Sequence, residues 1–87
     1  MSEVIGAMRR ALEPLAPQRL DIRDDSARHA GHAGARAGGH FAMTIVSPLF
    51  AGKLPMERHR MVYDALGVLM KTHIHALSID AKTPQET

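Results

Sequence analysis

The 87-residue chain contains no cysteine and no tryptophan, and it has only one tyrosine and two phenylalanines. Without thiols, the chain has no disulfide scaffold, no zinc site built from its own thiolates and no cysteine nucleophile. It also has no thiolate to supply to an iron–sulfur cluster. With so few aromatic rings, it lacks a platform on which several nucleic-acid bases could stack. The composition therefore excludes several kinds of site before any motif is considered.

Long hydrophobic runs are also missing, since no apolar stretch approaches the roughly 20 residues that a membrane-spanning helix needs. The first residues, MSEVIGAMRRALEP, place a glutamate before the arginines, which is the reverse of a secretory signal. We therefore expect a cytoplasmic protein with no membrane association. Hydrophobic residues make up 45% of the chain and charged residues 23%, which is typical of a globular protein. The length allows one small domain, spanning residues 1–87.

Two segments have the three- and four-residue spacing of apolar side chains that is typical of an amphipathic helix. The first covers residues 3–13, and Pro14 and Pro17 end it because proline lacks the amide donor of a helix interior. The second covers residues 55–71 and begins at Pro55, a residue that is favoured at the first helical position.

Three other segments alternate apolar and polar residues with the period of two that predicts strands. They are residues 18–25, 40–47 and 74–81. Both faces of the middle segment are largely apolar, which indicates a central strand. Residues 48–52 predict a turn or a short helical piece with Phe50 as its buried anchor. The glycine- and alanine-rich residues 26–39 predict a mobile loop, and we expect the polar tail, residues 82–87, to be frayed.

The order helix, strand, strand, helix, strand predicts an α/β domain of the α+β kind. Placing both helices on one face of a three-stranded sheet buries all the apolar faces at once. The first two strands would be antiparallel across the loop. A right-handed helical crossover would make the second and third strands parallel, which gives a mixed sheet. This arrangement is the outline of a class II KH-like domain.

Histidines are the side chains most suited to chemistry, because neutral imidazole is a common ligand of zinc, copper, nickel and iron. The six histidines are His29, His32, His40, His59, His73 and His75. His29 and His32 lie in the loop and could bend around an ion, or they are solvated surface residues. By parity, His75 lies on the same side as Leu77 and Ile79, so we expect a half-buried ring at the core edge, where a backbone carbonyl could also satisfy it. The residues alone leave these alternatives open.

A basic cluster at and before the start of the second helix is another candidate site. It consists of Lys53, Arg58, His59 and Arg60. Arginine is unfavourable in the first turn of a helix because the dipole is positive there. The cluster therefore indicates phosphate contacts of a nucleic-acid-binding protein, or else a solvated helical turn. The G-x-x-G at residues 31–34 lies between two strands rather than two helices, so we attribute its likeness to a KH loop to chance.

No constellation of nucleophile, base and orienting group stands out in the sequence, and neither a P-loop nor a dinucleotide-binding fingerprint is present. We therefore do not expect an enzyme.

Three linked motifs give the chain a resemblance to the BolA family. They are FAMTIVSPLFAG at residues 41–52, RHRMVYDAL at residues 58–66 and IHALSIDAKTP at residues 74–84, with DDSARH ahead of the loop. The resemblance covers nearly the whole chain. It implies an α-β-β-α-β domain of the KH-like class, which agrees with the order of elements derived above.

The BolA family is linked to iron–sulfur cluster handling with monothiol glutaredoxins and to DNA binding as a transcriptional regulator of morphology and stress responses. For the first role, the resemblance implies His75 as a cluster ligand and His29 as the best match for a second ligand in the loop. His40 also has a family counterpart and competes for that second position. The family's usual polar run is replaced here by RAGGHF at residues 36–41, and His32 is an extra imidazole, so the loop ligand stays open.

A [2Fe–2S] cluster accepts two imidazoles on one iron and two thiolates on the other. The resemblance thus implies a non-enzymatic adaptor that shares such a cluster with a monothiol glutaredoxin and glutathione in a heterodimer, and that alone is a monomer or weak homodimer. The first alternative is a DNA-binding regulator that uses the basic cluster, although a net charge of +2 argues against strong non-specific binding. The second alternative is a stand-alone metal-binding module built on the loop histidines.

Overall fold

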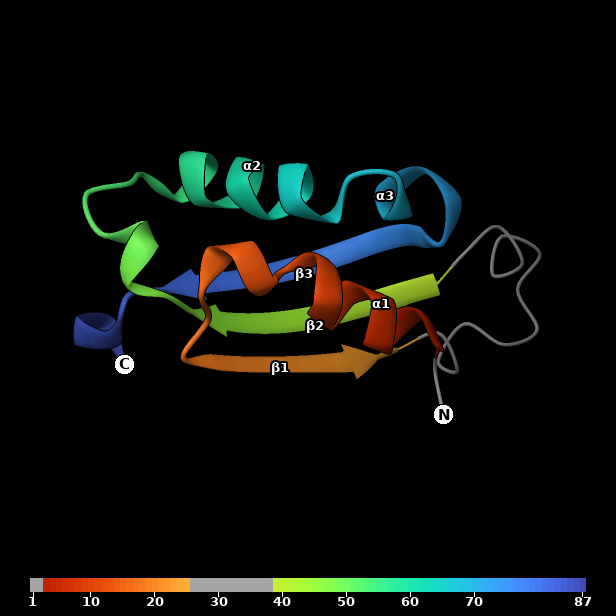
Figure 1. The fold of residues 1–87 in the computed structure, drawn as a ribbon, viewed down its shortest axis with the longest axis horizontal. Coiled ribbons are helices and arrows are strands. Elements are labelled where there is room, and N and C mark those ends of the chain that lie inside the picture. Colours follow the sequence, from red (N-terminus) through yellow and green to blue (C-terminus); the bar gives the residue numbers. More distant parts are fainter. Residues whose placement is uncertain (1–2, 26–38) are drawn as a thin grey trace.

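The computed structural model describes residues 3–25 and 39–87. Its helices and strands are, in chain order, α1 (Glu3–Ala11), β1 (Arg19–Asp24), β2 (Gly39–Val46), α2 (Pro55–Leu66), α3 (Leu69–Thr72) and β3 (Ile74–Lys82) (Figure 1). Short 3₁₀ helices cover Glu13–Leu15, Pro48–Phe50 and Pro84–Glu86. The predicted order of helix, strand, strand, helix, strand is confirmed. Most of the predicted loop, residues 26–38, lies outside the described residues.

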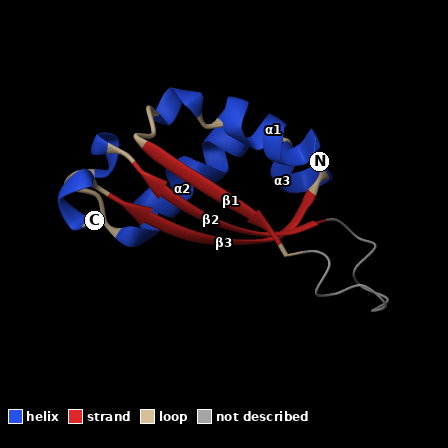
Figure 2. Cartoon of the chain, turned by 90° about the horizontal axis from the view of Figure 1, so that it is seen from below, coloured by secondary structure: helices blue, strands red, loops and turns tan. Residues whose placement is uncertain are grey.

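The sheet has the strand order β1-β2-β3. β1 is antiparallel to β2, and β2 is parallel to β3, so the sheet is mixed as predicted. β2 is the central strand, in agreement with the apolar character of both its faces. The helices lie on one face of this sheet and leave the other face open (Figure 2). Within residues 3–25 and 39–87, no helix is both long enough and apolar enough to cross a membrane.

A single apolar cluster fills the space between the helices and the sheet. Alternate residues of β2 enter it, because successive side chains of a strand point to opposite faces. These residues are Phe41, Met43 and Ile45, which are at most 5% exposed. Phe50 is fully buried and is the anchor that the sequence predicts. Burial of one large apolar side chain contributes about 1.5–3 kcal/mol, so this cluster is the main source of stability.

The prediction of one continuous helix over residues 55–71 is wrong beyond Leu66. α2 ends there because Gly67 has a φ of 53°, a left-handed value that favours glycine. The amide of Gly67 still donates to the carbonyl of Tyr63 at 2.9 Å, and α3 begins two residues later. Leu69 and Met70 pack against the core and continue the helical spacing of apolar residues. The break is therefore invisible to the hydrophobic pattern.

The expectation of a frayed tail over residues 82–87 is also wrong. β3 runs to Lys82, and Pro84–Glu86 form a 3₁₀ helix. Thr83 is 5% exposed, and its amide donates to Oε1 of Glu86 at 2.8 Å. The guanidinium of Arg58 donates to both oxygens of Glu86, at 2.6 and 3.1 Å. The tail is thus tied to the start of α2 by residues that lie far apart in the sequence.

Candidate functional site

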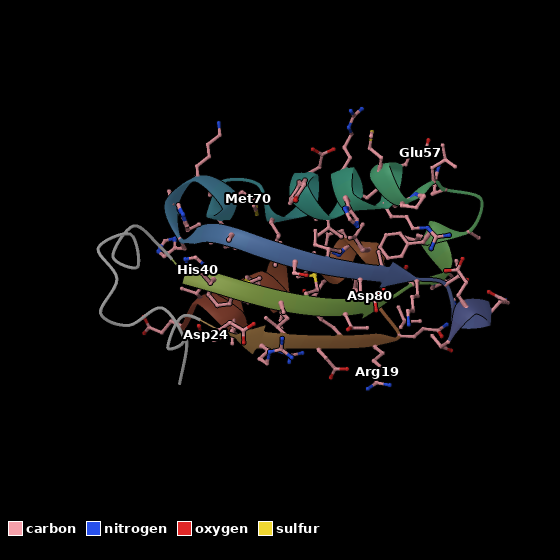
Figure 3. The ribbon with its side chains drawn as sticks, turned by 180° about the vertical axis from the view of Figure 1, so that it is seen from behind. Arg19, Asp24, His40, Glu57, Met70 and Asp80 are labelled. Atoms are coloured by element: carbon pink, nitrogen blue, oxygen red, sulfur yellow. The ribbon has the colours of Figure 1, made fainter. Side chains whose placement is uncertain are left out.

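Two histidine rings meet at one end of the sheet. His40 is the second residue of β2 and His75 is the second residue of β3. Because β2 and β3 are parallel, their amino-terminal ends lie side by side. The ring centroids of His40 and His75 are 5.2 Å apart, and the ring planes are inclined at 48°. Figure 3 shows His40 at this end of the sheet, with Asp24 nearby and Arg19 toward the opposite end.

A β-bulge turns His75 outward. Gly39 pairs with Ile74, but His40 pairs with Ala76, so His75 is the extra residue on β3. Ile74 is buried and Leu77 is half-buried, while His75 and Ala76 between them are exposed. The prediction that His75 lies on the side of Leu77 with a half-buried ring is therefore wrong. A bulge breaks the period of two, and strand parity assumes that this period is unbroken.

The surroundings of the two rings are shallow and open. A hollow of 290 Å³ lies beside them and is lined by Asp25, His40, Phe41, Ala76, Leu77 and Ser78. In the part of the chain that the structure describes, no group of three or more histidine, aspartate or glutamate side chains could hold a metal ion. The pair thus offers two nitrogen ligands, and an inorganic centre held there would need further ligands from outside the described residues. The interpretation as a stand-alone metal-binding module depends on His29 and His32, which lie in the undescribed segment.

His29 is the loop ligand that the family resemblance favours, and it also lies outside the described residues. The residues that flank this segment, Asp25 and Gly39, are both fixed at the histidine end of the sheet. The amide of Asp25 donates to the carbonyl of His40 at 2.7 Å, and the amide of Gly39 donates to the carbonyl of His73 at 3.0 Å. The segment that carries His29 therefore leaves from and returns to the end where His40 meets His75.

The four basic candidates do not share one role. Arg58 donates to the carbonyls of Lys53 and Ala81 as well as to Glu86, and its side chain is only 12% exposed. The hydrogen bonds from Arg58 to Glu86, and next the one from the amide of Thr83, lower the pKa of the Glu86 carboxyl from 4.5 to about 2. Arg58 is thus committed to holding the tail, which argues against a phosphate contact. Lys53 and Arg60 are exposed and His59 is half-buried, so these three remain candidates for binding an anion.

Exposed apolar side chains on the helical side of the molecule are a feature that the sequence reasoning missed. In the described residues, the large exposed ones are Leu49, Leu54, Met56, Tyr63 and Val68. All of them lie between the end of β2 and the start of α3. The helical spacing identified the buried side of α2 and left this outer side unexamined.

The fold and the site together define a small α+β domain whose mixed sheet presents two imidazoles at one end. A family model described as BolA-like protein matches residues 12–86. The chain belongs to the BolA-like family.

The similarity extends to whole sequences and to solved structures. The chain is 42% identical over 84 residues to BolA-like protein 1 of Mus musculus, and the matched region covers 95% of this chain and 60% of the mouse protein. It is 35% identical over 79 residues to the DNA-binding transcriptional regulator BolA of Escherichia coli (strain K12), with coverage of 91% and 70%. The BolA domain of SufE1 from Arabidopsis thaliana superposes with a TM-score of 0.86 at 43% identity, with coverage of 100% and 99%.

Some relatives are much longer than this chain. The chain spans 21% of the length of SufE-like protein 1, chloroplastic/mitochondrial, from Arabidopsis thaliana. It spans 60% of the mouse protein. The similarity therefore concerns the BolA-like domain that these proteins share with the chain.

Proposed function

We propose that this chain is a non-enzymatic adaptor that shares a [2Fe–2S] cluster with a monothiol glutaredoxin and holds one iron through imidazoles. The observation that carries the proposal is the pairing of His40 and His75, with ring centroids 5.2 Å apart. Two imidazoles bound to one tetrahedral metal at about 2.0–2.1 Å hold their centroids about 5 Å apart. The observed separation therefore suits joint binding to one metal ion.

His75 is the fixed member of the ligand set, because it is exposed on the bulge and matches the family's ligand position. His40 is the second ligand that the geometry favours, and His29 is the alternative that the resemblance favours. His29 follows Asp25 by four residues, and four extended residues reach about 13–14 Å at most. Since the amide of Asp25 is hydrogen-bonded to the carbonyl of His40, that reach allows His29 to serve as the second cluster ligand.

The remaining ligands must come from a partner. The chain has no cysteine, and a cluster with two imidazoles on one iron needs two thiolates on the other. A cysteine of a monothiol glutaredoxin and the cysteine of glutathione would supply these two thiolates. Imidazole binds a metal in its neutral form, so acid weakens the shared site.

The experiment that tests this function mixes the purified chain with a cluster-loaded monothiol glutaredoxin. We expect a changed visible circular dichroism spectrum, together with a one-to-one heterodimer on size-exclusion chromatography. The apo glutaredoxin with glutathione but without cluster serves as the control and should give no visible signal. An unchanged spectrum combined with separate elution of the two proteins contradicts the proposal.

DNA binding is the second candidate function, and it is supported by similarity to a DNA-binding regulator. A relative with 35% identity is named a DNA-binding transcriptional regulator. Lys53 and Arg60 are exposed and could contact phosphates, whereas Arg58 is engaged with Glu86. The test measures binding to duplex DNA at low and at high salt, because phosphate contacts weaken steeply as salt rises. Absence of binding at low salt removes this candidate.

A further inference from the structure

Three residues spaced by four, Met56, Arg60 and Asp64, lie along the outer side of α2, and Val68 follows four residues later, just beyond the break at Gly67. Residues four apart lie on the same side of a helix. Met56 is 76% exposed and Val68 is 67% exposed, and Tyr63, beside the middle of the stripe, is 41% exposed. We call Met56, Arg60, Asp64 and Val68 the outer stripe.

The outer stripe extends beyond the end of α2 at Leu66. One hollow of 660 Å³ is lined by Met56, Arg60, Tyr63 and Asp64 among others. A second hollow of 580 Å³ is lined by Tyr63, Asp64 and Val68 among others. Since Tyr63 and Asp64 line both hollows, the two hollows are neighbours on the outer side of this segment. In Figure 3, the labels of Glu57 at the start of α2 and Met70 in α3 mark the two ends of the helical segment along which these hollows lie.

The order of side chains along the outer stripe is apolar, basic, acidic, apolar. This order is self-complementary when a second copy is laid antiparallel on it. Met56 then faces Val68 of the second copy, and Arg60 faces Asp64 of the second copy. A two-fold axis generates each contact twice, as in an isologous dimer. In the described residues, neither Arg60 nor Asp64 has an ion-pair partner within its own chain.

We propose that the outer stripe is a homodimer interface in which α2 of one copy packs antiparallel against α2 of another. The contact is small, because the 12 residues of α2 span only about 18 Å. A stable interface buries about 1,200–2,000 Å² in total, so this dimer is weak and depends on protein concentration. His40 and His75 lie on the sheet and not on α2, and the pairing therefore leaves them uncovered.

The wild-type test is sedimentation equilibrium over roughly 10 µM to 1 mM protein. The apparent mass is expected to rise toward twice 9.5 kDa with concentration. A wild-type chain that stays monomeric throughout overturns the proposal. If that monomer binds duplex DNA and Arg60→Asp abolishes this binding, the stripe is a nucleic-acid surface, which overturns the proposal as well.

Charge reversal identifies the stripe as the contact. Arg60→Asp places two carboxylates opposite each other twice, and Asp64→Arg does the same with two guanidinium groups. Each variant alone is expected to dimerise at least about tenfold more weakly than wild type, because opposed like charges across an interface are costly. Arg10→Asp reverses an exposed charge on α1 and is the matched control, which should dimerise like wild type.

Mixing the two variants is the decisive measurement. In an equimolar mixture of Arg60→Asp and Asp64→Arg, every pair across the two-fold axis is again of opposite charge. The mixture is therefore expected to associate at least as strongly as wild type, although neither variant does so alone. Damage to one chain's own fold is not repaired by mixing, so recovery supports the proposed interface and a mixture that stays monomeric overturns it.

Discussion

The two ends of the sheet are built in opposite ways. At one end, where β2 and β3 finish, side chains from distant segments close the structure. Arg58 holds the tail through Glu86, and Ser47 donates to the carbonyl of Leu15 while it accepts from the amide of Leu49. At the other end, where β2 and β3 begin, His75 is exposed on a bulge beside His40. We call these the locked end and the histidine end.

In the proposed function, this difference separates the residues that stabilise the domain from the residues that would bind the cluster. The locked end buries its polar groups and satisfies them within the chain, as for Ser47, which is 0% exposed. At the histidine end, the rings of His40 and His75 are accessible, and the pairing of β2 with β3 holds their backbone in place. Ligands that must meet a partner's ligands need such accessible side chains on a rigid support. Substitutions at the two ends should therefore have different consequences.

The largest expected effect follows His75→Ala at the histidine end. The change removes the imidazole that the bulge presents, and we expect complete loss of the spectral change with cluster-loaded glutaredoxin. The free energy of unfolding should stay within about 0.5 kcal/mol of wild type, because the side chain is exposed. His32→Ala and His59→Ala are the controls and should leave the spectrum nearly intact. A His75→Ala chain that still gives the wild-type spectrum contradicts the ligand assignment.

The second ligand is decided by comparing His40→Ala with His29→Ala in the same assay. We expect the larger loss for His40→Ala if the pairing of His40 with His75 is the pair that binds. Removing a group that only hydrogen-bonds to a metal ligand lowers metal affinity by about 10–100-fold, so removing a ligand itself should lower it by at least that much. A larger loss for His29→Ala assigns the second position to the loop. Wild-type spectra from both variants contradict a two-imidazole site.

At the locked end, Ser47→Ala is expected to destabilise the fold by about 1–3 kcal/mol. The change leaves the carbonyl of Leu15 and the amide of Leu49 without their buried partner, and an unsatisfied buried polar group costs this much. Urea unfolding followed by far-ultraviolet circular dichroism measures the effect. Ser78→Ala, on the open sheet face, is the matched control and should change the free energy of unfolding by less than about 0.5 kcal/mol. The cluster spectrum should be unaffected by either change.

A smaller, pH-dependent effect is expected for Glu86→Gln. The pKa of Glu86 is lowered to about 2 in the folded chain, so its carboxylate stabilises the fold above pH 4.5 and loses this contribution as the pH falls toward 2. Wild type should therefore lose more stability between pH 4.5 and 2 than Glu86→Gln does. Thermal unfolding at a series of pH values measures the difference. Parallel pH profiles for the two chains would show that the Arg58–Glu86 pair does not stabilise the tail.

Much of the locked framework follows from local pattern. The period of two places Phe41, Met43 and Ile45 in the core, and the apolar character of both faces predicts that β2 is central. The spacing of apolar residues predicts both α1 and the first three turns of α2. Such patterns succeed because burial of alternate or helically spaced side chains depends on near neighbours in the chain.

The features that define the two ends depend on contacts that no local pattern records. The exposure of His75 arises from the register between β2 and β3. The tail is fixed by hydrogen bonds between Arg58 and Glu86, which lie 28 residues apart in the sequence. The sequence by itself determined the order of the elements, the composition of the core and the absence of thiolate ligands. Only the tertiary structure decided which imidazoles lie side by side and which arginine binds the carboxyl-terminal tail. Strand register and long-range hydrogen bonds form only once distant segments pack together.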